Sequence, residues 1–245
     1  MDNKMQLAKD KLIVALDVDT IERAEALVKQ LNGTVGMFKV GMQLFYSAGP
    51  DIVRRLKEQG VKVFLDLKLH DIPNTVGQAA KALAGLGADI INVHASGGSA
   101  MMRAAAEALQ EGAGVLNIPA PKLISVTILT SIDQNTFSGE IGLPGDIKDK
   151  VRDWALLTKG AGLQGVVCSP REIEIIREAC GQEFEIITPG IRPSWSVTGD
   201  QKRIMTPAEA IGLGASYLVV GRPITGAADP FDAAGRVLVE MTEGI

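Results

Sequence analysis

Residues 61–71 read Val61-Lys62-Val63-Phe64-Leu65-Asp66-Leu67-Lys68-Leu69-His70-Asp71. The first half is long and apolar enough for a strand that is buried on both faces. The three charges that follow must lie where this strand meets solvent or a cleft, which is where α/β sheets and barrels place their chemistry. Because side chains alternate along a strand, Asp66 and Lys68 project to the same side, and Asp71 follows in the turn. The segment predicts a charged functional site; an ion pair at a strand end is the purely structural alternative.

Short β-rich runs of this kind occur eight times, and helix-like stretches lie between them. The expected strands are residues 12–17, 37–40, 61–68, 89–94, 123–129, 165–168, 185–188 and 217–221. The expected helices are residues 21–31, 53–59, 76–86, 101–110, 147–158, 172–179 and 207–213, with a last one near the C-terminus. The alternation predicts a single (β/α)8 TIM barrel over residues 1–245.

Glycines support the same repeating unit. Gly60, Gly87, Gly162 and Gly214 each end a helical stretch shortly before the next strand, where a left-handed C-cap suits glycine. A doubly wound sheet is the alternative fold, but no Gly-x-Gly-x-x-Gly follows the first strand to support it.

Composition narrows the class of ligand. The 245 residues include 25 Lys and Arg against 29 Asp and Glu, a net charge of −4 that gives no electrostatic footprint for nucleic acid or an anionic membrane. A small-molecule ligand is therefore expected.

The polar N-terminus and the lack of a long apolar run predict a cytoplasmic protein. Cys168 and Cys180 are expected to be reduced, buried thiols, not metal ligands.

Polar and ionisable residues gather where the expected strands end. They are Asp17, Lys39, Asp66, Lys68, His94, residues 127–131, Cys168, Ser169, Arg192, Gly221 and Arg222. Charges near buried strand ends must be paired or solvated, so this clustering indicates a functional rim. His70 and His94 are interpreted as hydrogen-bonded structural residues, and a role as acid or base is the alternative.

The last two units indicate a phosphorylated substrate. Thr188-Pro189-Gly190-Ile191-Arg192-Pro193 and Val220-Gly221-Arg222-Pro223 place glycines and arginines after the seventh and eighth strands, where barrels bind phosphate. The polar loop 194–203 between them is long enough to act as a lid. Surface arginines beside ordinary turns, with a passive loop, are the alternative.

The chain resembles the bacterial orotidine 5'-monophosphate decarboxylase family over essentially its whole length. The matching segments are Ala15-Leu16-Asp17, Phe38-Lys39-Val40-Gly41, Phe64 through Thr75, Asn92-Val93-His94-Ala95, Val126 through Ser131, Thr188 through Pro193, Gly199-Asp200-Gln201 and Gly221-Arg222-Pro223. The resemblance implies a homodimeric barrel with shared active sites. It would convert orotidine monophosphate to uridine monophosphate and CO2, which is the last step of de novo uridylate synthesis. The reaction would need no metal or organic cofactor.

Residue roles follow from the same resemblance. Lys68 would donate the proton, within a charged array of Lys39, Asp66, Lys68 and an Asp71 supplied by the other subunit. Asp17 and Lys39 would bind the ribose, and Thr75 would also come from the partner. Thr130 would lie by the pyrimidine. The phosphate would be held by Arg192, Gln201, Gly221 and Arg222, with Gln201 on the lid.

The chemistry accounts for these residue types. Loss of CO2 from C6 leaves a carbanion that must be stabilised electrostatically, and a charged lysine both does this and donates a proton. Flanking carboxylates keep the lysine charged, which argues against a Schiff base. One alternative is a magnesium-dependent sugar-phosphate decarboxylase or aldolase of the same superfamily, which Lys39 opposes because a cation there would repel Mg²⁺. Another is a non-catalytic nucleotide-binding barrel.

Overall fold

Eight parallel strands close into a barrel in sequence order, each hydrogen-bonded to the next and β8 to β1. The computed structural model describes residues 3–196 and 205–245. The strands are β1 (Leu12–Ala15), β2 (Met37–Gly41), β3 (Val63–Leu69), β4 (Ile90–His94), β5 (Lys122–Val126), β6 (Gly165–Val167), β7 (Glu185–Thr188) and β8 (Tyr217–Val220). The predicted TIM barrel is thus confirmed, and all eight predicted strands are present.

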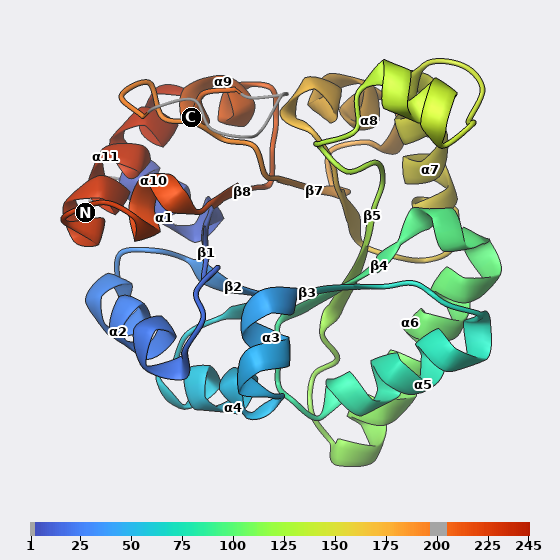
Figure 1. Ribbon diagram of the computed structural model, residues 1–245, viewed down its shortest axis with the longest axis horizontal. Helices are drawn as coiled ribbons and strands as arrows, with labels where there is room; N and C mark the ends of the chain where they lie inside the picture. The colour runs from blue at the N-terminus through green and yellow to red at the C-terminus, as the bar shows by residue number, and fades with distance from the viewer. Residues whose placement is uncertain (1–2, 197–204) are drawn as a thin grey trace.

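Helices surround the strands on the outside, as Figure 1 shows in a view along the barrel. They are α1 (Asn3–Lys11), α2 (Ile21–Leu31), α3 (Met42–Ala48), α4 (Asp51–Glu58), α5 (Pro73–Ala84), α6 (Gly98–Leu116), α7 (Ile147–Gly160), α8 (Ile173–Cys180), α9 (Pro207–Gly212), α10 (Arg222–Thr225) and α11 (Pro230–Glu243). No helix in the described ranges is both long enough and apolar enough to cross a membrane.

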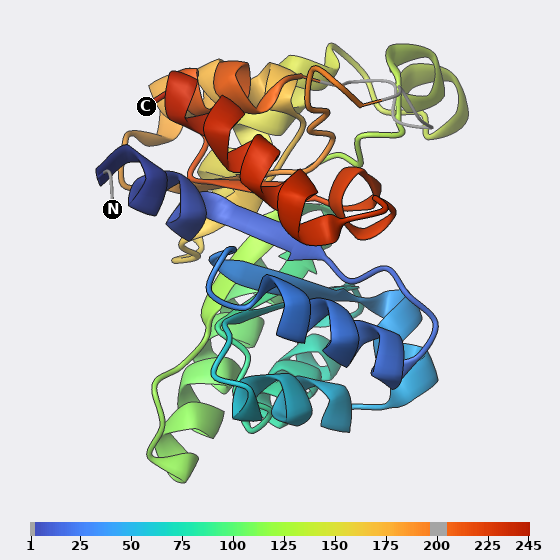
Figure 2. The same ribbon diagram turned by 90° about the vertical axis from the view of Figure 1, so that its left-hand side faces the viewer.

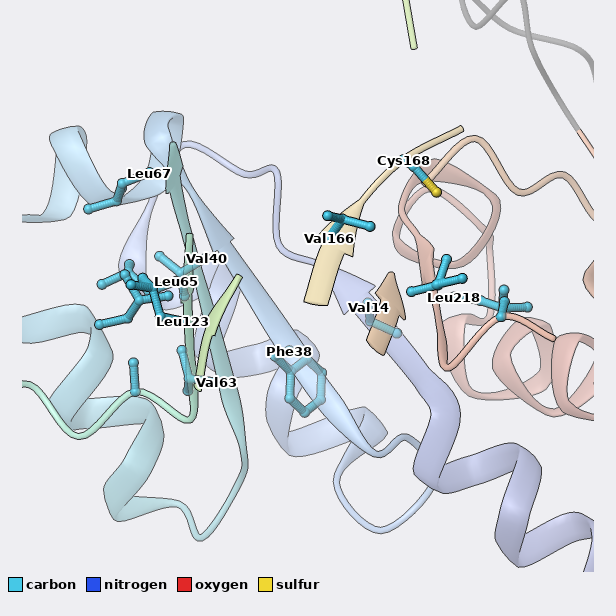
Figure 3. Packing of buried hydrophobic residues seen from close by; sticks show 14 of the residues in the cluster. Val14, Phe38, Val40, Val63, Leu65, Leu67, Leu123, Val166, Cys168 and Leu218 are labelled. Carbon is cyan, nitrogen blue, oxygen red and sulfur yellow. The ribbon is translucent and has the colours of Figure 1, made fainter. Parts of the chain in front are cut away.

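Two apolar layers result from the two-residue period of the strands. Val63, Leu65 and Leu67 of β3 face the helices and belong to the large outer core, where Figure 3 shows them on one side of the strand. The alternate positions face the barrel axis. Their apolar members are Ile13, Ala15, Met37, Phe64, Ile90, Ile124, Ile187 and Val219. This inner layer forms a packed floor beneath the carboxyl ends of the strands.

Glycines end the helices in the way the sequence predicts. Gly60, Gly87, Gly162 and Gly214 all have positive φ, between 76° and 98°. An L-residue rarely adopts this conformation, so glycine is favoured where the chain turns back toward the next strand.

Three α-helices of the described ranges were not predicted from the sequence. In Figure 2, α1 lies at the end of the barrel where the strands begin, and it packs against α11. The short helices α3 and α10 follow β2 and β8. The connection between β4 and β5 also differs from the prediction. A helix was predicted over residues 101–110, whereas α6 continues to Leu116 before the chain turns toward β5.

Candidate active site

A cavity of about 300 Å³ opens at the carboxyl ends of the strands. Of the residues predicted for the site, it is lined by Asp17, Lys39, Asp66, Lys68, Thr130, Arg192, Gly221 and Arg222. These residues come from the ends of β1, β2, β3 and β8 and from the loops after β5, β7 and β8. The fold therefore brings together in one cavity most of the residues that the sequence predicts for the site.

Strand β3 supplies two of the charges. Phe64 faces the barrel axis in the inner apolar layer, and Asp66 and Lys68 continue toward the cavity on the same side. The prediction that Asp66 and Lys68 share one side of the strand is confirmed. Leu65 and Leu67 on the opposite side are buried among the helices and fix the strand in this orientation.

The charges form a continuous chain of alternating sign. Lys39 Nζ lies 3.0 Å from Asp17 Oδ1 and 3.4 Å from Asp66 Oδ2. Asp66 Oδ1 lies 2.7 Å from Lys68 Nζ. The side chains of Lys39 and Asp66 are only 10% and 12% exposed, whereas that of Asp17 is 57% exposed. The inner two charges are thus mostly removed from water, where electrostatic interactions are stronger.

Gly41 leaves space for this row of alternating charges. A Cβ at position 41 would lie 2.9 Å from Lys39 Nζ and 3.4 Å from Asp17 Oδ1. The first distance is shorter than real Cβ contacts, so a side chain at position 41 would displace the ammonium from its place between the two carboxylates.

Strand β3 is irregular where the charges lie. Leu65 pairs with Ile91 and Leu69 pairs with Val93, so the register shifts between them. Lys68 has φ 54°, a left-handed conformation that costs a non-glycine residue about 1–3 kcal/mol. The strain lies at Lys68, one of the two charged residues of β3. Backbone strain of this kind clusters at functional sites, so it indicates that Lys68 is functional.

Asn92 contacts both charged residues of β3 and was not assigned a role from the sequence. Its Nδ2 donates to Asp66 Oδ1 at 2.7 Å, and its Oδ1 accepts from the backbone N–H of Lys68 at 2.8 Å. Asn92 is fully buried on β4. The signal available in the sequence was a polar amide within the otherwise apolar start of the strand, Ile90-Ile91-Asn92-Val93.

The cavity is also lined by two arginines, Arg192 and Arg222. Arg192 is 8% exposed, and its Nη1 donates to the backbone carbonyl of Ile191 at 3.0 Å. Gly190, just before this segment, has φ 82°. Arg222 follows β8 as the first residue of α10. Two guanidinium groups lining one cavity can bind a phosphate.

Two predicted site residues in the described ranges do not line this cavity. Asp71 and Thr75 are exposed and are absent from its lining. The Asp71 carboxylate accepts instead from the backbone N–H of Ile72 at 2.7 Å. Gln201 and most of the predicted lid (residues 197–203 of 194–203) lie outside the described residues.

Two histidines lie beside the site. The ring centroids of His70 and His94 are 5.4 Å apart. Burial lowers the pKa of His94, and the nearby His70 and Lys68 lower it further, whereas Asp66 acts in the opposite direction. The charged form of His94 is therefore disfavoured relative to a histidine in water.

The two cysteines are buried, as the sequence predicts, and Cys168 lines the cavity. Within residues 3–196 and 205–245, no three His, Cys, Asp or Glu side chains group in a way that could hold a metal ion.

Comparison with known proteins gives one consistent result. Residues 10–237 match the family described as orotidine 5'-phosphate decarboxylase / HUMPS. An orotidine 5'-phosphate decarboxylase from Moorella thermoacetica is 57% identical over 234 residues, which is 96% of this chain and 93% of that protein. One from Syntrophomonas wolfei is 52% identical and covers 96% of this chain and 99% of its own. The crystal structure of orotidine 5'-phosphate decarboxylase from Lactobacillus acidophilus superposes with a TM-score of 0.82 at 42% identity, covering 94% of this chain and 98% of that one.

Proposed function

The chain belongs to the orotidine 5'-phosphate decarboxylase / HUMPS family. From this premise we propose how the residues of its cavity carry out the decarboxylation. The enzyme decarboxylates orotidine 5'-monophosphate to uridine 5'-monophosphate and CO2, the last step of de novo pyrimidine nucleotide synthesis. The observation that carries the mechanism is the chain of alternating charges from Asp17 through Lys39 and Asp66 to Lys68.

Lys68 is the proton donor in this proposal. When the C6–carboxylate bond breaks, its electron pair stays on C6, and the Lys68 ammonium stabilises this charge where it forms. The ammonium then gives a proton to C6, and the neutral amine recovers a proton from water. Asp66 Oδ1, 2.7 Å from Lys68 Nζ, favours the charged form of the lysine before the reaction.

Asp66 has a second effect in the proposal, because a carboxylate near the substrate carboxylate repels it and the repulsion ends as CO2 leaves. Two unit charges 4 Å apart interact by about 4 kcal/mol at an effective dielectric constant near 20. Enzymatic rate enhancements require about 8–23 kcal/mol. The charged array therefore needs a further contribution from substrate binding.

Phosphate binding supplies that contribution. Arg192 and Arg222 hold the phosphate, together with Gly221 and with Gln201 of the loop outside the described residues, while Thr130 lies by the pyrimidine. Asp17 and Lys39 bind the ribose. Binding energy from a group remote from C6 can position the base and exclude water, so a substrate without phosphate should lose rate as well as affinity.

The active site is shared between two copies of the chain in this proposal. Asp71 and Thr75 are exposed and lie away from the cavity of their own chain, which supports their belonging to the site of a partner. Ile72 between them is 66% exposed, an unusual state for an isoleucine that a second copy would cover. The homodimer would thus complete each charged array with an Asp71 from the other chain.

The reaction needs no metal or organic cofactor in this proposal. Lys39 Nζ lies within 3.4 Å of both Asp17 and Asp66, which is where a divalent cation would have to sit between these carboxylates. This arrangement favours decarboxylation by side-chain charges over the magnesium-dependent alternative.

We also propose that residues 1–245 form one domain. We propose that the enzyme works in the cytoplasm, which fits its buried thiols.

The test is the fall in absorbance as the purified enzyme converts orotidine monophosphate, with and without excess EDTA. We expect turnover that the chelator does not change. Lys68→Ala should keep the fold by circular dichroism and lose turnover by more than about 10⁴-fold, because both charge stabilisation and the proton are removed. Wild-type turnover in this variant would remove Lys68 from its role. Turnover abolished by EDTA would favour the metal-dependent alternative.

A further inference from the structure

Asn92 joins the two charged residues of β3 from inside the barrel. It is fully buried on β4 and makes one hydrogen bond to the side chain of Asp66 and one to the backbone of Lys68. The orientation of its amide is determined by these partners, because a backbone N–H can only donate and an ionised carboxylate can only accept. Both hydrogen bonds of this buried side chain therefore go to the charged array.

The register of β3 against β4 explains why such a residue is needed. Leu65 pairs with Ile91 and Leu69 pairs with Val93. Asp66, Leu67 and Lys68 therefore bulge opposite the single residue Asn92. A bulge re-aims side chains and leaves backbone groups without their ladder partners. Here the N–H of Lys68 finds its acceptor in the Asn92 side chain, while Lys68 itself has φ 54°.

We propose that Asn92 is a positioning residue, which holds the bulge of β3 and thereby directs Lys68 Nζ to Asp66 Oδ1 and into the cavity. The proposal rests on the role of Lys68 as proton donor given above. It explains the residue type, because the position needs one acceptor and one donor on a short side chain. Leucine offers neither, and ionised aspartate offers no donor and would repel Asp66.

Loss of Asn92 should act on the chemical step. Without it the Lys68 N–H has no side-chain acceptor, so the left-handed conformation loses a hydrogen bond that maintains it. A return of Lys68 to negative φ changes the direction of its side chain and moves Nζ from the reacting carbon. The arginines that hold the phosphate are on β7 and β8 loops and would stay in place.

The first experiment compares Asn92→Ala with Ser125→Ala by steady-state kinetics and by inhibition with uridine monophosphate. Ser125 is a matched control, because it is a buried polar residue of the neighbouring strand whose hydroxyl bonds Thr158 at 2.6 Å, away from the charges. We expect Asn92→Ala to lower kcat by about 100-fold, the effect of a misplacement near 1 Å, with inhibition by uridine monophosphate changed less than about threefold. Ser125→Ala should keep wild-type kcat.

Asn92→Asp gives a second readout, which a residue needed only for folding would not move. A protonated aspartic acid has one donor and one acceptor and can replace the amide, whereas the ionised form repels Asp66. Its ratio of kcat to that of wild type should therefore rise as pH falls. Lys39, Asp66, Lys68 and His94 also face this region, so the variant is compared with wild type at each pH, and Asn92→Ala is the uncharged control. For Asn92→Ala the ratio should not change with pH.

Several results would overturn the proposal: a kcat of Asn92→Ala within about threefold of wild type, an equal loss in Ser125→Ala, or a higher KM at unchanged kcat. If Asn92→Ala does not fold, Asn92→Asp decides, since a pH-independent ratio also contradicts the proposal. Lys68→Ala separates this inference from the proposed function. An active Lys68→Ala refutes the role of Lys68 as proton donor, on which this inference rests. An inactive Lys68→Ala beside a fully active Asn92→Ala refutes only the role of Asn92.

Discussion

Lys39 shows how a single residue can hold a charged site together. Its ammonium is shared by Asp17 and Asp66, which would otherwise place two carboxylates on one side of a cavity. Gly41, two residues further along β2, leaves the space that the ammonium occupies. The position of one cation thus depends on the absence of a neighbouring side chain.

Gly41→Ala tests this dependence. The new methyl group would meet Lys39 Nζ at 2.9 Å, and the flexible lysine would move away instead of the backbone. We expect kcat/KM to fall by about 10- to 100-fold and the free energy of unfolding to change by less than about 1 kcal/mol. Steady-state kinetics and urea unfolding measure both. Unchanged kinetics would show that the site tolerates a displaced Lys39.

His94 should give the protein a pH-dependent stability. Its pKa in the folded protein is lowered by burial, so on acidification the unfolded chain takes up a proton at a pH where the folded protein does not. Stability should therefore fall as pH drops from about 6.5 toward the lowered pKa of the folded state. His94→Gln removes this contribution, so its unfolding free energy should decline less over the same range. Urea unfolding at several pH values measures the difference; parallel curves for the two proteins would contradict it.

At the scale of elements, glycine conformation decides whether an alanine stabilises or destabilises. Gly60 has φ 76° after α4, whereas Gly235 lies inside α11, and an added Cβ meets no atom within 4 Å at either position. Gly60→Ala should cost about 1–2 kcal/mol through strain, and Gly235→Ala should gain about 0.5–1 kcal/mol. Both should keep wild-type turnover. Thermal or urea unfolding gives the sign, and destabilisation by both substitutions would refute the conformational argument.

The elements that the sequence predicts well are those with strong local signals. Buried strands such as β3 and β8 stand out as apolar runs, and the helices between them end at glycines. Helix α1 was missed because only Ala8 of it is buried, so it has little apolar face. The bulge in β3 was missed because a regular two-residue alternation already places Asp66 and Lys68 on one side. Asn92 acts through that bulge, so its role could be found only from the pairing of two strands.

At the scale of the whole molecule, the barrel separates packing from chemistry. Phe64 and Ile90 fill the interior below the charges, because each lies two residues before Asp66 or Asn92 on the same side of its strand, and Ile124 pairs beside Asn92. Water is thereby excluded from one side of the charged array, which strengthens its interactions. The other side opens to the cavity.

The proposed shared active site makes a quantitative prediction for mixed dimers. Lys68→Ala and Asp71→Ala should each be nearly inactive alone, because every site then lacks either its proton donor or the partner's carboxylate. In a mixed dimer one site carries both substitutions, whereas the other combines an intact Lys68 from one chain with an intact Asp71 from its partner. If equal amounts are unfolded together and refolded, random pairing makes half of the dimers mixed, and activity should return to about one quarter of wild type. Kinetics after refolding, with each variant refolded alone as control, measure this recovery. If the mixture stays as inactive as its components, Lys68 and Asp71 act within one chain, and the exposed position of Asp71 would need another explanation.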